Sequence, residues 1–135
     1  MQRCDITLTA MRWSLALPTD RVDRAEEFLT AGAVAEAARA AEAAGFDAVY
    51  VTDHPAPDRR WLDGGGHHAL EPTVALAFAA AATDRLLLQT NVYVAAYRNP
   101  FLAAKAISSL DVLSDRKSTR LNSSHVSESR MPSSA

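Results

Sequence analysis

A repeated alternation of buried-strand and helix-forming segments constrains the fold of this chain more than any other feature. Three segments are mainly apolar and contain no charged residue: 13–17 (WSLAL), 48–52 (AVYVT) and 86–94 (LLLQTNVYV). Each is followed by a segment with helix-forming composition or spacing: 31–44, 72–82 and 100–113. Strands without polar alternation are typical of sheets that are buried on both faces. The sequence therefore predicts an α/β fold in which helices cover a parallel sheet.

Residues with capping chemistry mark the ends of two predicted helices. Gly45 follows the alanine-rich segment and can adopt the left-handed conformation of a C-cap, with Phe46 placed to fold back on the last turn. Asn99 and Pro100 form an N-cap and first-turn pair at the start of the third helix. These residues predict where the first helix ends and where the third helix begins.

The predicted topology places the carboxyl ends of the three strands on one rim. Right-handed crossovers bring Asp53 and His54 to that rim together with the loop 93–99. Ligands of α/β folds bind at this rim. An open doubly wound sheet and a closed barrel begin with the same units, so the periodicity leaves both architectures open.

Asp53 and His54 are the reactive pair of the rim. They follow the second strand directly, and Pro55 prevents that strand from continuing. Histidine can act as an acid or base near neutral pH, and the aspartate could hold the ring or raise its basicity. The alternative is that Asp53 caps a turn and His54 is a solvated loop residue. From the dipeptide alone the structural alternative is favoured, because two residues are a weak motif.

Other motifs near the rim favour structural interpretations. The glycine run 64–66 is interpreted as a flexible hinge, because no helix N-terminus follows at the spacing of a phosphate cradle. His67 and His68 are adjacent and so point apart, and no metal site is expected. Tyr93 and Tyr97 could stack on a planar ligand, but at strand ends ordinary packing is the favoured interpretation.

The composition argues against several classes of binding partner and indicates a cellular location. The net charge of −2 gives no electrostatic reason to expect nucleic acid or an anionic membrane as a partner. A lone cysteine, Cys4, allows no internal disulfide and fits a reducing compartment. No apolar run has the length of a membrane span or the form of a signal peptide. The expected location is therefore the cytoplasm.

The second predicted helix lacks the polar face that an outer helix normally shows to solvent. Residues 73–82 (TVALAFAAAA) contain no charged side chain. Either the long loop 53–71 or a second subunit must cover them. Alanines on both faces suit close helix–helix packing, so a dimer surface is the favoured interpretation.

Two longer stretches, AEAAGFDAVYVTDHPAP and LQTNVYVAAYRNPFLAAKAISSLDVLS, together resemble the luciferase-like monooxygenase superfamily. The similarity is closest to its branch of oxidoreductases that use the deazaflavin coenzyme F420, and it covers residues 11–114. The resemblance implies the first three βα units of a (β/α)8 TIM barrel, a fold that takes about 250 residues. We therefore expect the chain to be a truncated N-terminal part of a longer protein, called the parent protein below.

The resemblance also implies residue roles and a cofactor. His54 is expected to be the catalytic acid/base, with Asp53 beside it. Asn91 and Val92 map onto a bulge after the third strand, often a non-proline cis peptide behind the central ring of the flavin. Thr90, Asn91 and Val92 are accordingly the expected cofactor-binding residues, and F420 is the expected cofactor, with FMN as the alternative.

Three functions are compatible with this resemblance. The first is hydride transfer between F420 and a small organic substrate. The second is an FMN-dependent monooxygenase that uses dioxygen, and the third is a non-catalytic barrel remnant. The parent protein is expected to form a homodimer through its helices at 72–83 and 100–113, and the truncated chain is expected to be inactive.

The two ends of the chain are interpreted as separate from the partial barrel domain of residues 11–114. Residues 115–135 contain seven serines, against four in all the preceding residues. Back-translation of 115–125 and 129–135 can give a common short-read sequencing adapter, so we interpret the tail as an artefact that forms no packed structure. A natural disordered tail is the alternative. Residues 1–10 are interpreted as a leader or a wrongly assigned start, because Met11 begins a strand directly.

Overall fold

The computed structural model describes residues 11–115. The expectations for the leader 1–10 and for the tail beyond Asp115 fall on residues outside this described part. Nothing in the described structure tests those two expectations, which stay predictions.

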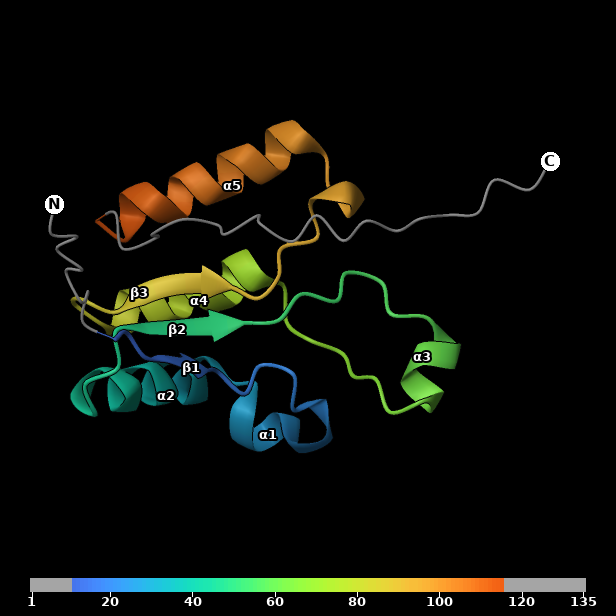
Figure 1. Cartoon of the computed structure of the whole chain (residues 1–135), viewed down its shortest axis with the longest axis horizontal. Helices are drawn as coiled ribbons and strands as arrows, with labels where there is room; N and C mark the ends of the chain where they lie inside the picture. The colour runs from blue at the N-terminus through green and yellow to red at the C-terminus, as the bar shows by residue number, and fades with distance from the viewer. Residues whose placement is uncertain (1–10, 116–135) are drawn as a thin grey trace, which may run out of the picture.

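The described residues contain a three-stranded parallel sheet, as predicted. Its strands are β1 (Ser14–Ala16), β2 (Ala48–Val51) and β3 (Leu87–Thr90), in the order β1-β2-β3. The register pairs Leu15 with Val49 and Val49 with Leu88. All three arrows point the same way, so their carboxyl ends share one edge (Figure 1).

The third strand is shorter than predicted, because β3 ends at Thr90 and does not continue to Val94. Its last contact with the neighbouring strand is the hydrogen bond from Asn91 N to Val51 O, at 2.8 Å. β2 ends at Val51, so within residues 11–115 the apolar residues that follow Asn91 have no strand to pair with. The high β propensity of the segment 92–94 is overridden by the absence of a partner.

The three long helices lie where the sequence predicts them: α2 (Ala31–Ala43), α4 (Pro72–Ala82) and α5 (Pro100–Leu113). The side chain of Asn99 caps α5 by accepting from Phe101 N at 3.0 Å. Gly45 has φ +87° after α2, and Phe46 N returns to Ala41 O at 3.1 Å. Both predicted caps are therefore confirmed.

Four short elements were not predicted: η1 (Val22–Arg24), α1 (Ala25–Phe28), α3 (Arg59–Asp63) and η2 (Ala95–Tyr97). The element with the greatest consequence is α3, which lies inside the loop 53–71. Asp58 starts this helix by accepting from Trp61 N at 2.7 Å. Helices of one turn carry no usable hydrophobic periodicity, so only a capping residue announces them.

The core lies between the sheet and the helices α2 and α4. Val49 and Val51 of β2 are almost fully buried, as is Leu86 just before β3. Ala38 of α2 and Ala79 of α4 have no exposed surface, and these small side chains let the two helices pack closely. This packing fixes both helices against β2.

The opposite face of the sheet carries side chains that remain at least partly exposed. Because side chains alternate along a strand, Tyr50 faces away from the side that carries Val49 and Val51. Its register partners, Ala16 and Gln89, lie on the same face, and all three remain at least partly exposed. Within residues 11–115 the helices pack on one face of the sheet only, which is the arrangement of the first three βα units of a (β/α)8 barrel. The predicted fold class is confirmed.

The uncharged helix α4 keeps apolar side chains in solvent. Val74 is 57% exposed and Phe78 is 47% exposed. The loop 53–71 therefore leaves this stripe of α4 uncovered. Within residues 11–115, none of the helices combines the length and the apolar character needed to cross a membrane.

Glu42 links the end of α2 to the turn before β3. Its carboxylate accepts hydrogen bonds from the backbone N–H groups of Asp84, Arg85 and Leu86, the shortest being 2.7 Å from Arg85. Burial raises the pKa of Glu42, but these backbone hydrogen bonds outweigh it and hold the pKa below its ordinary value of 4.5. The charged form therefore stabilises the fold.

Replacing Glu42 by Gln should lower the free energy of unfolding by about 1–2 kcal/mol, because charge-assisted bonds become neutral ones. Since the folded pKa is depressed, the stabilisation is present above pH 4.5 and is lost as the pH falls through the folded pKa. Urea unfolding at several pH values measures both effects, with Glu36→Gln, an exposed glutamate of α2, as the control. Equal losses in the two variants would contradict this account.

Candidate functional site

The candidate site is a pocket of about 310 Å³ at the carboxyl edge of the sheet. The loop that carries α3 leaves the tip of β2 and extends beyond the ends of the strands (Figure 1). Residues from this loop and from the segment after β3 line the pocket: Asp53, His54, Pro55, Ala56, Pro57, Asp58, Trp61, Val94 and Tyr97. The predicted rim therefore does bring Asp53 and His54 together with the segment 93–99.

Asp53 is buried, and both of its carboxylate oxygens are engaged. Arg98 donates to Oδ2 through Nη1 at 2.6 Å and to Oδ1 through Nη2 at 2.9 Å. The backbone N–H of Val94 donates to Oδ2 at 2.8 Å. A bidentate guanidinium–carboxylate pair has fixed geometry as well as charge complementarity. Asp53 thus ties the end of β2 to the segment after β3.

Arg98 makes three further contacts. Nη1 donates to Val94 O at 3.0 Å, and Nη2 donates to Glu71 Oε1 at 3.2 Å. The guanidinium carbon lies 4.3 Å from the centre of the Tyr93 ring. The other carboxylate oxygen of Glu71 caps α4 by accepting from Val74 N at 2.9 Å. One arginine therefore links the loop after β2, the start of α4 and the segment after β3.

These contacts favour one of the two roles suggested for Asp53 over the other. Its oxygens bond Arg98 and Val94, so within residues 11–115 the aspartate does not hold the ring of His54 by a hydrogen bond. The reason is that Arg98 offers two charged N–H donors, which bind a carboxylate more strongly than one imidazole N–H. The charge of Asp53 still raises the pKa of His54, as the sequence suggested, but other effects outweigh it.

His54 lies in a cluster of aromatic rings. Its ring centre is 4.7 Å from that of Trp61 and 4.7 Å from that of His67, the latter in an edge-to-face arrangement. Burial lowers the pKa of His54 and the charge of His67 lowers it further, against the opposing effects of Asp53 and Asp20. Together these effects lower the pKa of His54 from its ordinary value, which favours the neutral ring, the form that can accept a proton.

Gly66 makes room for the Trp61 ring that covers His54. A Cβ atom at Gly66 would lie 2.3 Å from two ring carbons of Trp61, which is far inside contact distance. Gly65, at φ +95°, turns the chain so that this close approach is possible. The glycine run therefore shapes the packing against His54, a more specific role than the predicted hinge.

Replacing Gly66 by Ala should displace Trp61 from His54, because the new methyl group and the indole would occupy the same space. In a Trp13→Phe background Trp61 is the only tryptophan, and its fluorescence should shift to longer wavelength as the ring becomes more hydrated. Gly64→Ala is the control, because a Cβ there meets its nearest atoms at 3.4 Å. An unchanged spectrum for the Gly66 variant would contradict the steric argument.

The predicted cofactor-binding residues lie at the end of β3. Thr90 is the last residue of the strand, and Asn91 and Val92 follow with exposed surface. The peptide bond between Asn91 and Val92 is cis, as the resemblance implied. None of the three lines the pocket around His54, and their assignment to cofactor binding stays a prediction.

Thr52 adds a polar group that the sequence did not single out. It follows Val51 at the tip of β2, on the sheet face that carries Tyr50. Its hydroxyl oxygen is buried and has no hydrogen-bond partner among the described residues. A buried polar atom of this kind at a ligand-binding rim is suited to a bound polar group.

The structure also shows where the two rim tyrosines and the adjacent histidines lie. Tyr93 packs under Arg98, which supports the packing alternative, whereas Tyr97 is 73% exposed and lines the pocket. His67 contacts His54, while Nδ1 of His67 lies 3.1 Å from the carbonyl oxygen of His68. Within residues 11–115, no three His, Cys, Asp or Glu side chains converge as metal ligands would.

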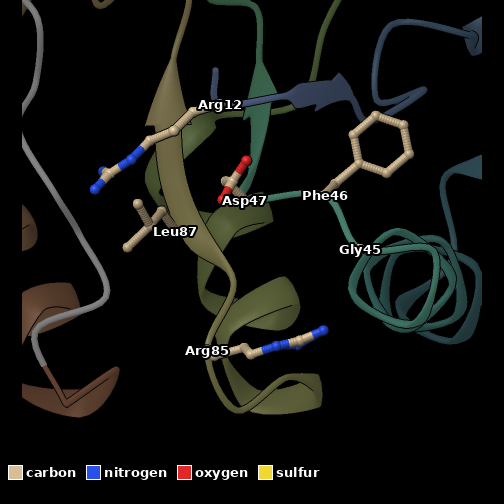
Figure 2. A pocket seen from close by; sticks show the side chains of 6 residues that line it. All are labelled: Arg12, Gly45, Phe46, Asp47, Arg85 and Leu87. Atoms are coloured by element: carbon tan, nitrogen blue, oxygen red, sulfur yellow. The ribbon is translucent and has the colours of Figure 1, made fainter. Parts of the chain in front are cut away.

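A second pocket, of about 430 Å³, lies at the amino ends of the strands, away from His54. Figure 2 shows Asp47 in its centre, with the side chains of Arg12 and Arg85 pointing in opposite directions. Asp47 accepts from Trp13 N at 2.8 Å and so joins the starts of β1 and β2. In barrels this end of the strands serves stability and the other end serves ligands. The pocket around His54 is therefore the better candidate site.

Sequence reasoning missed Arg98, Glu71 and Trp61. The available signal for Arg98 was its position as the one cation in the rim loop 93–99, opposite a carboxylate at the tip of β2. Glu71 precedes Pro72, which is the pattern of an N-cap carboxylate before a first-turn proline. For Trp61 no comparable sequence signal exists.

Comparison with known proteins identifies the family. The sequence profile of the family described as luciferase-like monooxygenase matches residues 11–115. The chain belongs to the luciferase-like monooxygenase family. Two curated relatives carry F420 in their names. The F420-dependent glucose-6-phosphate dehydrogenase of Beutenbergia cavernae is 41% identical over 80 residues, which is 58% of this chain and 23% of the relative.

The F420-dependent hydroxymycolic acid dehydrogenase of Mycobacterium tuberculosis is 39% identical over 89 residues, which is 65% of this chain and 23% of that protein. The chain thus spans less than a quarter of the length of these two relatives. Both matches agree with the F420-dependent branch that the sequence resembles.

Solved structures of other proteins share the fold. The oxygenating constituent of 3,6-diketocamphane monooxygenase from Pseudomonas putida, in complex with FMN, superposes with a TM-score of 0.63 at 19% identity. That match covers 81% of this chain and 28% of the other. The F420-dependent tetrahydromethanopterin reductase of Methanopyrus kandleri gives 0.58 at 20% identity, covering 81% and 26%. These likenesses support the barrel fold alone.

Proposed function

We propose that the parent protein is an F420-dependent oxidoreductase that moves a hydride between the coenzyme and a small organic substrate. His54 is the residue that handles the substrate proton. The observation that carries the proposal is the environment of His54, a half-buried histidine at the ligand-binding rim whose pKa is lowered. The F420-dependent names of both curated relatives support the choice of coenzyme.

The residues at the rim fit a planar cofactor in two respects. Among residues 11–115, no helix packs on the face of the sheet that carries Tyr50 and Gln89, and the Thr52 hydroxyl at its carboxyl edge has no hydrogen-bond partner. Thr90, Asn91 and Val92 follow on the neighbouring strand and would hold the ring system there. F420 supplies a carbon that accepts or donates a hydride when it is bound.

His54 completes the proton balance of the reaction. When an alcohol is oxidised, the hydride leaves from the carbon and the hydroxyl proton must leave from the oxygen. A neutral ring nitrogen of His54 accepts that proton, and in the reverse direction the protonated ring returns it to the carbonyl oxygen. The lowered pKa favours the unprotonated ring, which suits the oxidative direction.

Titration of the parent protein with oxidised F420 tests the choice of cofactor. The parent protein is obtained by continuing the genomic reading frame past Ser114. Saturable quenching of the deazaflavin fluorescence, without comparable binding of FMN, is the expected result. Binding of FMN with no binding of F420 would instead support an FMN-dependent monooxygenase, and binding of neither would support a non-catalytic barrel.

We further propose that the parent protein forms a homodimer through α4 and α5. The exposed Val74 and Phe78 of α4 and the exposed Phe101 and Leu102 of α5 provide apolar surface of the kind that interfaces bury. Replacing Phe78 by Asp should convert the dimer to monomer, as measured by sedimentation. Val22→Asp, at an apolar residue of similar exposure outside both helices, is the control. A wild-type monomer would overturn this proposal.

A further inference from the structure

We propose that Arg98 is a positioning residue for the proposed reaction, which neutralises Asp53 and holds its carboxylate away from the ring of His54. This inference rests on the proposed role of His54 as the proton acceptor. Arg98 itself does not line the pocket around His54, so it acts through Asp53.

The geometry of the pair carries the inference. The side chain of Asp53 is 2% exposed and that of Arg98 is 15% exposed, so water screens their charges little. Both oxygens of Asp53 accept from Arg98, and Oδ2 also accepts from Val94 N. Asp53 precedes His54 in the chain, yet all of these donors come from the segment after β3. The carboxylate is thereby fixed by groups other than the His54 ring.

The charges around His54 show why the pairing of Asp53 with Arg98 affects the protonation of His54. Asp53 and Asp20 favour the protonated ring, whereas burial and His67 favour the neutral ring. Asp58 also lines the same pocket, and Trp61 covers the ring without adding charge. An unpaired buried carboxylate at position 53 would tip this balance towards the imidazolium. An imidazolium cannot accept the substrate proton, so pairing Asp53 preserves the reactive form of His54.

The contacts of Arg98 require a guanidinium. Its two terminal nitrogens bond Asp53 in parallel and reach Val94 O and Glu71 Oε1 as well, while its carbon lies over Tyr93. A lysine ammonium is a point charge without this fork, so it can neutralise Asp53 but cannot reproduce all of these contacts. Arg98→Lys therefore separates the charge of the residue from its geometry.

The test is an NMR titration of His54 in the 135-residue chain, with its signal identified by its loss in His54→Gln. In Arg98→Met the pKa of His54 should rise by about one unit, because the charge of Asp53 is no longer balanced. In Arg98→Met with Asp53→Asn the pKa should fall back, and in Arg98→Lys it should stay close to that of the unaltered chain. Equal pKa values in the single and double variants would overturn the proposal.

Two features keep this test decisive. A purely structural role for Arg98 would loosen the loop in both Met variants and move His54 equally towards its ordinary pKa. If Arg98→Met does not fold, the variant Asp53→Asn is used in its place. In that variant the positive charge of Arg98 has lost its main partner and should lower the pKa of His54. An unchanged pKa overturns the proposal. The titration uses no cofactor or substrate. The proposed role of Arg98 can therefore be overturned while the proposed function stands, and the proposed function can be overturned while the role of Arg98 stands.

Discussion

Replacing His54 by Ala in the parent protein should lower turnover by about 10²–10⁴-fold, the usual contribution of a positioned acid or base. Affinity for F420 should change little, because Thr90, Asn91 and Val92, the proposed cofactor-binding residues, do not line the pocket that His54 lines. Steady-state kinetics and a fluorescence titration measure the two quantities separately. His68→Ala is the matched control, since His68 is exposed in the same loop and does not line the pocket.

The pH dependence provides a second test of the same role. A general base must be unprotonated, so kcat/KM for alcohol oxidation should fall as the pH drops through the pKa of His54. Burial and the neighbouring His67 place that pKa below 6.5. If the His54→Ala variant turned over as fast as the unaltered parent protein, or if kcat/KM did not fall at acidic pH, His54 would not be the general base.

Replacing Asp53 by Ala should cost about 3–5 kcal/mol of unfolding free energy, because it leaves Arg98 charged and partly buried without its main partner. Small domains have about 5–15 kcal/mol in total, so the variant should lose much of its stability. Urea unfolding of the 135-residue chain measures this effect. Asp63→Ala, at an exposed aspartate of α3, is the control.

The double variant Asp53→Ala with Arg98→Met sharpens this measurement. It removes both charges together, so it should be less damaging than Asp53→Ala alone. If the single aspartate variant is as stable as the Asp63 control, the Asp53–Arg98 pair contributes nothing to the fold and the structural part of this account fails.

The fold was largely predictable because its signals are local. Gly45 and Asn99 end and start helices through contacts with residues a few positions away, and a single sequence displays such pairs. The errors arose where a tertiary partner decides or where a helix is too short to show a periodicity. The segment 92–94 has strand-forming side chains but no strand beside it, and α3 depends on Asp58 and one turn of chain.

The location of the site was predictable, but its internal contacts were not. Topology alone puts Asp53 and His54 at the rim, since strand ends meet there. The partner of Asp53 lies 45 residues away in the sequence, and only the folded chain brings Arg98 to it. In the same way, the contact of Trp61 with His54 depends on the absence of a side chain at Gly66, whose meaning appears only in three dimensions.

The most direct test of the central claim is the anaerobic reduction of F420 by a panel of secondary alcohols. The visible absorbance of the oxidised deazaflavin reports the reaction, and the parent protein is compared with its His54→Ala variant. We expect at least one alcohol to bleach the coenzyme without dioxygen, about 10²–10⁴-fold more slowly in the variant. No bleaching by any alcohol, together with dioxygen consumption in the presence of reduced FMN, would contradict the account.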